Sequence, residues 1–518
     1  MFGSSGRLAV LIVALVVVAA APASAAAVQA RPADSFVDSI GVNVHLPDDG
    51  TPYGERFGEV RDDLQSLGVR HVRDVLFVGV PEEYRRLREL ADLDIHSTLI
   101  LGDPDDGSWV LGELLALVRD GLGDSVEAVE GPNEFSTRGG PEWQPHLVAY
   151  QRRLYEAVAA DPALAGLPVL GPSIVHGDQD ELGDVSDWLD FGNIHSYPQG
   201  GPPDKLGSAI ARAEINSGSK PILATETGYN TALSWTGENP PVSEAAMATY
   251  MPRLFFEYFR WGIARTFAYE LVDEHDDPGL ANREDHFGLL RHDLSEKPAF
   301  AALRNTIAIL ADPGPAFAAG SLEYTLSDGG VELPGGESPE LHKVLLQRRD
   351  GSFDLALWRP TSVWDQAAQQ PQDPGEAPVT VGLPPGYFAA AVYRPSQSAE
   401  PVWTSSLPSD SLSLEVGPEV AIVKLRPVIA VTPPPVTREQ AVNPPPIVDP
   451  PPPPAPHCVV PKLKGGSLQA DRKRLRRAGC RLGAVTGPRR RAARVVRQRP
   501  RPGAVLEQGA SVSVVLGR

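Results

Sequence analysis

The chain has 518 residues, of which 42% are hydrophobic and 22% are charged, and its formal net charge is -19. This length exceeds one ordinary domain, so we expect several domains with sizeable hydrophobic cores. From Cys458 to Arg518 there are sixteen Lys and Arg against Asp471 and Glu507, so this tail is +14 and the rest of the chain is -33. The acidic body argues against nucleic acid or an anionic membrane as a partner, whereas the basic tail suits an anionic polymer or is an Arg-rich solvated surface.

The first 25 residues have the features of a secretory signal peptide. Arg7 precedes the apolar stretch Leu8–Ala21, and the small residues Ala23-Ser24-Ala25 follow, so cleavage is predicted near Ala25. An uncleaved membrane anchor is the alternative, but the stretch is short and no polar or basic stop signal follows it. We therefore expect a secreted protein that has no membrane contact after cleavage.

Residues 36–312 have the pattern of repeated βα units, in which short β-rich runs alternate with amphipathic helical stretches. The expected strands are Ile40–His45, Val69–Leu76, Ile95–Leu101, Val126–Gly131, Val169–Ile174, Phe191–His195, Pro221–Thr225 and Thr266–Leu271. Eight such units in about 270 residues predict an α/β fold, a (β/α)8 barrel. A doubly wound open sheet is the alternative, but no Gly-rich phosphate loop supports it.

Three further segments follow the barrel. A β-sandwich is predicted for residues 316–427, because strands such as Phe353–Trp358 are separated by Gly, Pro and Ser. Residues 428–457 are rich in Pro and predict an extended linker, and residues 458–518 form a small α+β module that contains both cysteines, Cys458 and Cys480. Because an exported chain meets oxidising conditions, we expect these cysteines to form a disulfide worth roughly 3 kcal/mol.

Two carboxylate motifs end predicted strands of the barrel. Asn133-Glu134 follows the fourth strand, and Glu226 follows the seventh strand 92 positions later. The C-terminal ends of barrel strands line one face, so we expect the two carboxyl groups to meet across one pocket. Retaining glycoside hydrolysis needs such a pair, with one carboxyl group protonated to donate to the departing oxygen and one ionised to attack the anomeric carbon.

On these motifs, residues 38–310 resemble the clan A glycoside hydrolases, which are retaining enzymes built on barrels. The resemblance implies that Glu134 is the acid/base and that Glu226 is the nucleophile. It also implies that Arg73, near the end of the second strand, keeps the nucleophile ionised, as an adjacent guanidinium does to a carboxylate.

The same resemblance assigns roles to other positions near strand ends. His195 and Tyr197, in His-Ser-Tyr-Pro, match the residues that border the nucleophile, and Asn133 matches the residue that binds the sugar 2-hydroxyl. Tyr269 stands where many members of the clan have a Trp beneath the bound sugar, so the resemblance implies that Tyr269 supplies the stacking surface. The neighbouring Glu270 is an alternative nucleophile.

Asn43 and His45 end the first strand with the same side-chain parity, which indicates a substrate subsite or a structural pair. His45, His176, His195 and His275 lie near strand ends and raise the alternative of a metal-dependent barrel hydrolase, but their spacing is not that of a compact ligand set. A non-catalytic barrel that binds glycans is the other alternative.

The tail resembles a single PASTA repeat, on the segments Val460–Gly465, Pro500–Ala504 and Ser511–Leu516 with a helical segment up to Cys480 between them. The resemblance implies a wall-associated module whose partner is peptidoglycan or another anionic wall polymer. We therefore expect a secreted, cell-wall-associated retaining glycosidase that cleaves β-linked O-glycosidic bonds of a polysaccharide or oligosaccharide and needs no cofactor.

Overall fold

The computed structural model describes residues 27–104, 111–175, 177–333, 338–428, 457–463, 468–487, 494–502, 504–507 and 509–517. The chain divides into two compact units, residues 1–431 and 432–518. The predicted signal peptide and nearly all of the predicted Pro-rich linker lie outside the described residues. Within the described ranges, no helix combines the length and the apolar character that crossing a membrane requires.

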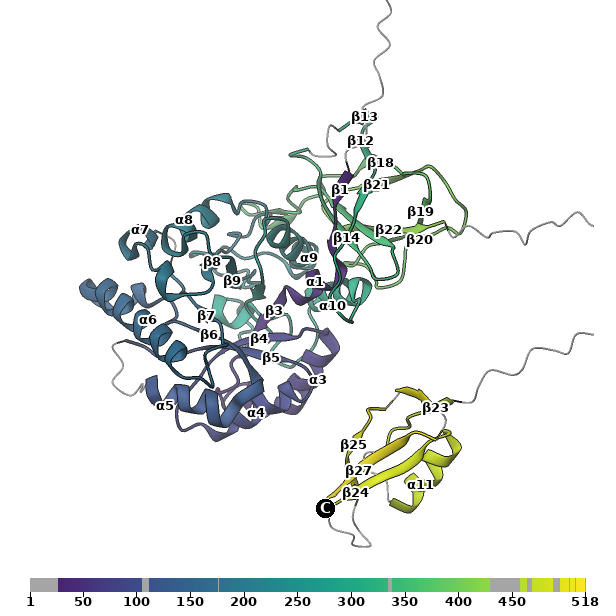
Figure 1. Ribbon diagram of the computed structural model, residues 1–518. Helices are drawn as coiled ribbons and strands as arrows, with labels where there is room; N and C mark the ends of the chain where they lie inside the picture. The colour runs from purple at the N-terminus through teal and green to yellow at the C-terminus, as the bar shows by residue number, and fades with distance from the viewer. Residues whose placement is uncertain are drawn as a thin grey trace, which may run out of the picture. The chain divides into compact units, whose positions relative to one another are not determined.

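Eight parallel strands of the first unit form one sheet in the order β7-β6-β5-β4-β3-β10-β9-β8 (Figure 1). Their bounds are β3 (Ile40–Asn43), β4 (His71–Val75), β5 (His96–Ile100), β6 (Val126–Glu130), β7 (Val169–Leu170), β8 (Gly192–His195), β9 (Ile222–Thr227) and β10 (Thr266–Ala268). A parallel bridge between Leu170 and Phe191 joins the two end strands, and Gly171 N donates to Phe191 O at 2.9 Å. The sheet is therefore a nearly closed barrel, and all eight expected strands are present.

Helices connect these strands and lie around the outside of the sheet (Figure 1). Their bounds are α1 (Ala33–Asp38), α2 (Pro52–Glu55), α3 (Phe57–Leu67), α4 (Pro81–Ala91), α5 (Leu111–Ala116), α6 (Trp143–Ala160), α7 (Gln179–Leu182), α8 (Gly207–Ser217), α9 (Glu244–Arg260) and α10 (Pro298–Leu310). In α3 the buried residues Phe57, Val60, Leu64 and Leu67 recur at helical spacing, and the helix ends at Gly68, whose φ of 85° is accessible to glycine. Burial of one apolar stripe against the strands thus fixes the helices around the barrel.

Two antiparallel-rich sheets form the rest of the first unit, in the orders β13-β12-β18-β21 and β2-β14-β15-β22-β19-β20. The main strands are β12 (Thr325–Asp328), β14 (His342–Gln347), β15 (Phe353–Trp358), β18 (Ala377–Gly382), β19 (Tyr387–Tyr393), β21 (Ser411–Val416) and β22 (Ala421–Pro427). The short strands are β13 (Val331–Glu332) and β20 (Trp403–Thr404), with β16 (Trp364–Asp365) and β17 (Gln370–Pro371) as a separate pair. Leu326 and Val381 of one sheet share a hydrophobic core with Leu355 and Val423 of the other, so the two sheets pack face to face.

The outer face of the six-stranded sheet packs on the barrel helices. Trp358 of β15 lies 5.6 Å from Phe256 of α9 between ring centroids, and its indole nitrogen donates to the buried Glu257 at 2.8 Å. The chain before the barrel pairs with strands that follow it. β1 (Ala27–Gln29) and β11 (Ser321–Glu323) form a separate two-stranded sheet, and β2 (Arg31–Pro32) pairs with β14 of the six-stranded sheet. The sheets are therefore built from both ends of the first unit.

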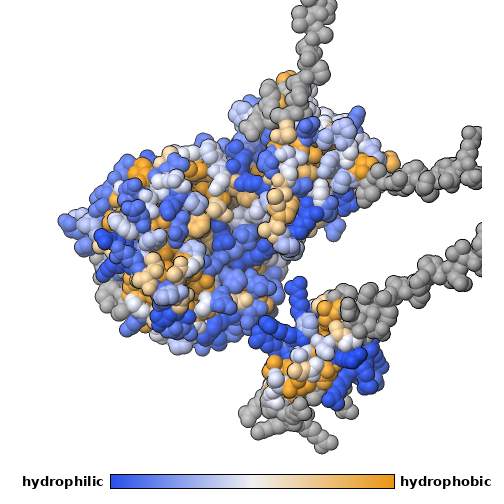
Figure 2. Space-filling view, in the orientation of Figure 1, coloured by the Kyte–Doolittle hydropathy of each residue, from blue (hydrophilic) through white to orange (hydrophobic). Residues whose placement is uncertain are grey.

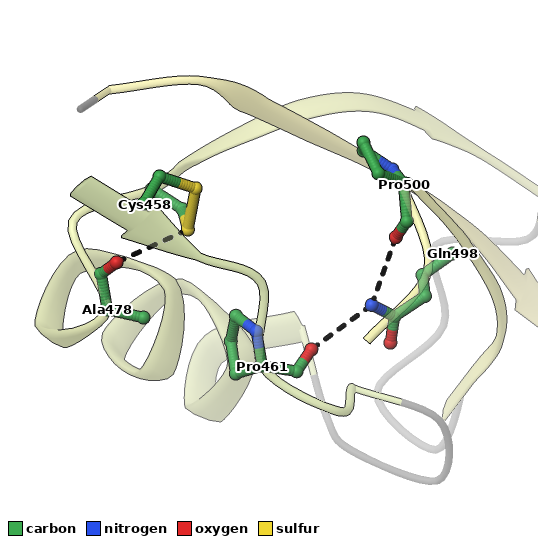
Figure 3. The surroundings of a disulfide bond; sticks show 6 residues. Cys458, Pro461, Ala478, Gln498 and Pro500 are labelled. Carbon is green, nitrogen blue, oxygen red and sulfur yellow. Dashed lines mark hydrogen bonds between the residues drawn. A yellow bond between two sulfur atoms is a disulfide. The ribbon is translucent and has the colours of Figure 1, made fainter. Parts of the chain in front are cut away.

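The second unit contains two small sheets and one helix. β23 (His457–Val459) pairs with β26 (Val505–Glu507), and β24 (Arg481–Thr486) and β25 (Arg494–Arg499) flank β27 (Ser511–Gly517). The helix is α11 (Leu468–Arg477), and strongly hydrophilic side chains lie beside hydrophobic ones on the visible surface of this unit (Figure 2). The expected disulfide between Cys458 and Cys480 is confirmed, and nearby Gln498 Nε2 donates to Pro461 O at 3.1 Å (Figure 3). The likeness of this unit to a PASTA repeat stays a prediction.

Candidate active site

One cavity of about 1120 Å³ lies at the C-terminal ends of the barrel strands. Its walls include nine of the candidate residues: Asn43, His45, Arg73, Asn133, Glu134, His195, Tyr197, Glu226 and Tyr269. These residues come from six different strands or the segments that follow them, so only the closed sheet places them around one space.

Glu226 lies near the end of β9, with 12% of its side chain exposed. Its Oε1 accepts from Arg73 Nη1 at 2.8 Å, and its Oε2 accepts from Tyr197 OH at 3.1 Å. Burial alone would raise the pKa of Glu226, but the charges of His195 and Arg73 and the hydrogen bonds from Arg73 and Tyr197 outweigh it and lower the pKa. Glu226 is therefore held as an ionised carboxylate facing the cavity.

A bulge in β9 aims two consecutive side chains into the same region. Ile194 and His195 of β8 pair with Ala224 and Glu226, so Thr225 is an extra residue in β9. In a regular strand Thr225 and Glu226 would face opposite sides of the sheet. Here Thr225 Oγ1 lies 3.0 Å from His195 Nε2, on the side where Glu226 meets Arg73.

Glu134 follows β6 and begins a short 3-10 helix, Phe135–Thr137, with a left-handed backbone at φ 44°. This conformation is costly for a non-glycine residue, and local hydrogen bonds stabilise it. Glu134 N donates to Ser173 Oγ at 3.0 Å, and Thr137 N donates to Glu134 O at 3.1 Å. The side chain is one-third exposed, and its Oε1 lies 2.7 Å from His195 Nδ1.

The two glutamates meet at His195. One atom each of Glu134, His195 and Glu226 lies within 4.8 Å of the other two, and His195 Nδ1 is 3.4 Å from Glu226 Oε2. Carboxyl groups about 5 Å apart suit retention, whereas inversion needs roughly 6.5–9.5 Å. The geometry thus provides two carboxyl groups in different settings, one bound by a guanidinium and one bound by an imidazole.

Arg73 is the centre of a buried hydrogen-bond network. It makes two bonds to Glu130, from Nε at 2.6 Å and from Nη2 at 2.7 Å, besides the bond to Glu226. Asn43 Oδ1 and Asn133 Oδ1 accept its remaining protons at 3.0 Å and 2.7 Å. Two carboxylates therefore balance one cation, and the guanidinium has a single orientation.

A second branch of this network leads from Glu130 to Glu134. Asn193 Nδ2 donates to Glu130 Oε1 at 3.0 Å, which leaves Asn193 Oδ1 to accept from Thr225 Oγ1 at 2.7 Å. The single hydroxyl proton of Thr225 is then used, so Thr225 accepts from His195 Nε2. The contact between His195 Nδ1 and Glu134 consequently needs a proton of its own, held by either partner.

Aromatic side chains form one side of the cavity. The Tyr269 ring lies 5.3 Å from Phe287 and 5.7 Å from His45 between centroids, and Phe287 also packs on Tyr197 at 5.7 Å. Gly228, after β9, allows this arrangement because a Cβ there would lie 2.4 Å from Tyr269 O. Tyr269 therefore lies in an aromatic wall of the cavity, and its role as a stacking surface stays a prediction.

The His45 ring contacts two carboxyl groups, those of Glu270 and Glu274. Its Nδ1 bonds Glu274 and lies 3.4 Å from Glu270 Oε2. Burial alone would lower the pKa of His45, but Glu270 and Glu274 outweigh it and raise the pKa to about 10. Burial raises the pKa of Glu270 well above its usual value. Glu270 is not among the described residues that line the cavity, so the geometry does not favour it as a nucleophile.

The histidines of the metal-hydrolase alternative have separate partners. His195 lies between Glu134 and Glu226, His45 lies against Glu270 and Glu274, and His275 is 60% exposed beside Asp285. Among the described residues these three histidines share no cluster of metal ligands. The fourth, His176, lies outside the described residues.

The sequence interpretation missed several members of the site. Glu130, Asn193 and Ser173 support the glutamates from inside the barrel. A charged Glu130 directly after the apolar pair Ala128-Val129 was the available signal, because an unpaired carboxylate is costly when it is buried. Nothing in the sequence pointed to Ser173 or to the pairing of Glu270 and Glu274 with His45.

No protein-family model and no curated protein matches the chain. Solved structures with a similar fold include the glycoside hydrolase family 17 β-1,3-glucanosyltransferase of Rhizomucor miehei, at 20% identity and a TM-score of 0.41 over 52% of this chain and 97% of that one. A glucosidase from Croceicoccus marinus is 12% identical, with a TM-score of 0.49 over 71% of this chain and 92% of that one. The β-glucuronidase of Bifidobacterium dentium is 20% identical, with a TM-score of 0.39 over 54% and 47%. Because these similarities are low, we base the function on the site itself.

Proposed function

We propose that the barrel is a retaining β-glycosidase in which Glu226 is the nucleophile and Glu134 is the acid/base. The observation that supports this proposal is the meeting of the two carboxyl groups at His195 in one cavity, with only Glu226 bound by a guanidinium. That asymmetry is what double displacement requires, because the attacking carboxylate must be ionised while the other group carries a proton.

The reaction has two balanced steps. An oxygen of Glu226 attacks the anomeric carbon, the bond to the departing sugar oxygen breaks, and Glu134 gives that oxygen its proton. Water then attacks the same carbon of the glycosyl-enzyme, Glu134 takes a proton from the water, and the bond to Glu226 breaks. Two inversions at one carbon leave the original configuration.

The network around Arg73 and Glu130 serves both steps. Arg73 and Tyr197 stabilise the carboxylate of Glu226 as it leaves the glycosyl-enzyme. Asn133 has its amide oxygen bound to Arg73 and Ser173, which turns its amide protons toward an incoming hydroxyl group. The sugar ring packs against Tyr269, whose face is apolar and whose position is fixed by Phe287.

The proposal is tested with purified protein incubated with glucans, xylans, mannans and a panel of aryl β-glycosides. We expect release of sugar whose first-formed anomer, followed by NMR, is β. An α product would show inversion, and binding without any product across the panel would favour the glycan-binding alternative. Either result would overturn the proposal.

We also propose that the chain is exported and that its second unit is a PASTA-like module that binds an anionic wall polymer. The basic strand β25 and helix α11, each with several exposed Arg or Lys, support this proposal. Isolated cell walls should retain the intact protein, and salt should release it. Replacement of Arg494, Arg497 and Arg499 by Gln should weaken retention, and equal retention would contradict wall binding through charge.

A further inference from the structure

A second group of one imidazole and two carboxylates lies in the barrel, next to the catalytic one. His45 follows β3, and Glu270 and Glu274 follow β10. One ligand atom from each of the three residues lies within 4.8 Å of the others. The His45, Glu270 and Glu274 side chains are 26%, 0% and 18% exposed, so Glu270 is fully buried and the other two are partly exposed.

The two groups differ in how their negative charge is balanced. In the catalytic group Arg73 bonds Glu226 at 2.8 Å, and Tyr197 takes the other oxygen. Around Glu270 the strongest electrostatic neighbours are His45, Glu274 and Asp273, and Asp273 is already paired with Lys297 at 2.8 Å. A single imidazole therefore faces two carboxyl groups that have no guanidinium or ammonium partner among the described residues.

Glu270 also has an unused oxygen. Its Oε2 faces His45 and accepts from Tyr53 OH at 3.3 Å, whereas its Oε1 is buried and has no hydrogen-bond partner among the described residues. A buried carboxylate oxygen without a partner costs free energy, and such groups call for a ligand that the protein itself does not supply. The sister oxygen Oε2 lies 3.4 Å from His45 Nδ1, so the carboxyl group that carries the unused oxygen is a member of this group.

We propose that His45, Glu270 and Glu274 bind one divalent cation that takes mixed nitrogen and oxygen ligands, Zn²⁺ or Mn²⁺. The distance of 3.4 Å between His45 Nδ1 and Glu270 Oε2 is close to the separation of two ligands held at about 2.1 Å by a tetrahedral ion. Glu274 is hydrogen-bonded to the same nitrogen and has to move away from it to become the third ligand. Ca²⁺ and Mg²⁺ prefer sites made of oxygen alone, so the imidazole selects against them.

Binding of the ion releases one proton to solvent. The proton shared by His45 Nδ1 and Glu274 must leave to solvent, because a metal ligand has to be deprotonated. His45 lines the cavity, so water or a sugar hydroxyl can occupy the fourth position on the ion. The ion would tie the segment after β3 to the segment after β10, and it is separate from the two-glutamate chemistry, which needs no metal.

The experiment uses the full chain without a histidine tag, stripped with chelator and titrated with ZnCl2 or MnCl2 by calorimetry. We expect one ion per chain, a melting temperature raised by the ion, and no comparable effect of CaCl2. Glu274→Gln and His45→Gln remove partly exposed ligands, so the fold should survive, and each should weaken binding at least tenfold.

Glu134→Gln is the matched control, because it makes the same Glu-to-Gln change in the catalytic group of Glu134, His195 and Glu226. It should leave the affinity for the ion unchanged. Substoichiometric binding by the unaltered chain would overturn the proposal, as would equal affinity in Glu274→Gln and His45→Gln. Loss of binding in Glu134→Gln alone would move the ion to the catalytic group and equally overturn it.

Discussion

Replacement of Glu226 by Gln removes the proposed nucleophile while keeping its shape. Arg73 retains its two bonds to Glu130, at 2.6 and 2.7 Å, and its bonds to Asn43 and Asn133, so the guanidinium stays neutralised and oriented. We therefore expect a stability loss of only about 1–3 kcal/mol, the range for losing a hydrogen bond to a charged group. Turnover should fall by roughly 10⁴–10⁶-fold, or about 5.5–8 kcal/mol at 1.36 kcal/mol per tenfold change.

The companion variant Glu226→Ala opens space for an added azide ion beside Arg73. Azide should then attack the anomeric carbon once, and the product should be an α-glycosyl azide. In Glu134→Ala the glycosyl-enzyme still forms on Glu226, so azide should give the β-glycosyl azide. NMR of the two products assigns the roles independently of any rate. Substantial hydrolysis by Glu226→Gln, or a β-azide from Glu226→Ala, would refute the assignment.

Three other changes test the supporting structure. Tyr197→Phe removes a hydrogen-bond donor that lowers the pKa of Glu226. Because Glu226 must be ionised to attack, the acid limb of the pH profile of kcat/KM should move to higher pH, and kcat should fall about tenfold or more. An unmoved acid limb would show that Tyr197 does not act on the nucleophile. Glu130→Gln leaves buried Arg73 with one carboxylate, so urea unfolding should show a loss of about 3–5 kcal/mol, whereas Glu59→Gln, on the surface, should have no measurable effect. Cys480→Ser opens a disulfide that spans 22 positions and should destabilise the second unit by roughly 3 kcal/mol, visible as a lower melting transition in the full chain; an unchanged transition would mean that the disulfide does not hold this unit.

The barrel was predictable because its signal is local and repeated. Each expected strand contains a short β-rich stretch, although β7 and β10 are shorter than expected, and the position of a strand in the barrel follows from chain order. Residues at strand ends, such as Glu134 and Glu226, must then share one face whatever their distance in the chain. The predicted seventh strand ended at Thr225, whereas β9 continues to Thr227, because the prediction followed the apolar run and the strand extends past it through Glu226.

Other features depend on contacts that no local pattern encodes. The pairing of β1 with β11 joins Ala27 to Glu323, and nothing in a three-residue strand specifies so distant a partner. Glu130 accepts hydrogen bonds from both Arg73 and Asn193. The sequence indicates a buried carboxylate at this position, but it does not indicate these two partners, because they come from other strands. Long-range geometry decides these features, and propensity alone cannot supply it.

The pairing of β1 and β2 with strands near residues 321–347 has a consequence for biosynthesis. At about 5–20 residues per second, a ribosome needs roughly 15–60 s to make the intervening chain. During that lag β1 and β2 have no partner strands, and the sheets that contain them cannot be completed. Any factor that meets the nascent protein therefore encounters it while β1 and β2 are still unpaired, and these pairings form late in synthesis.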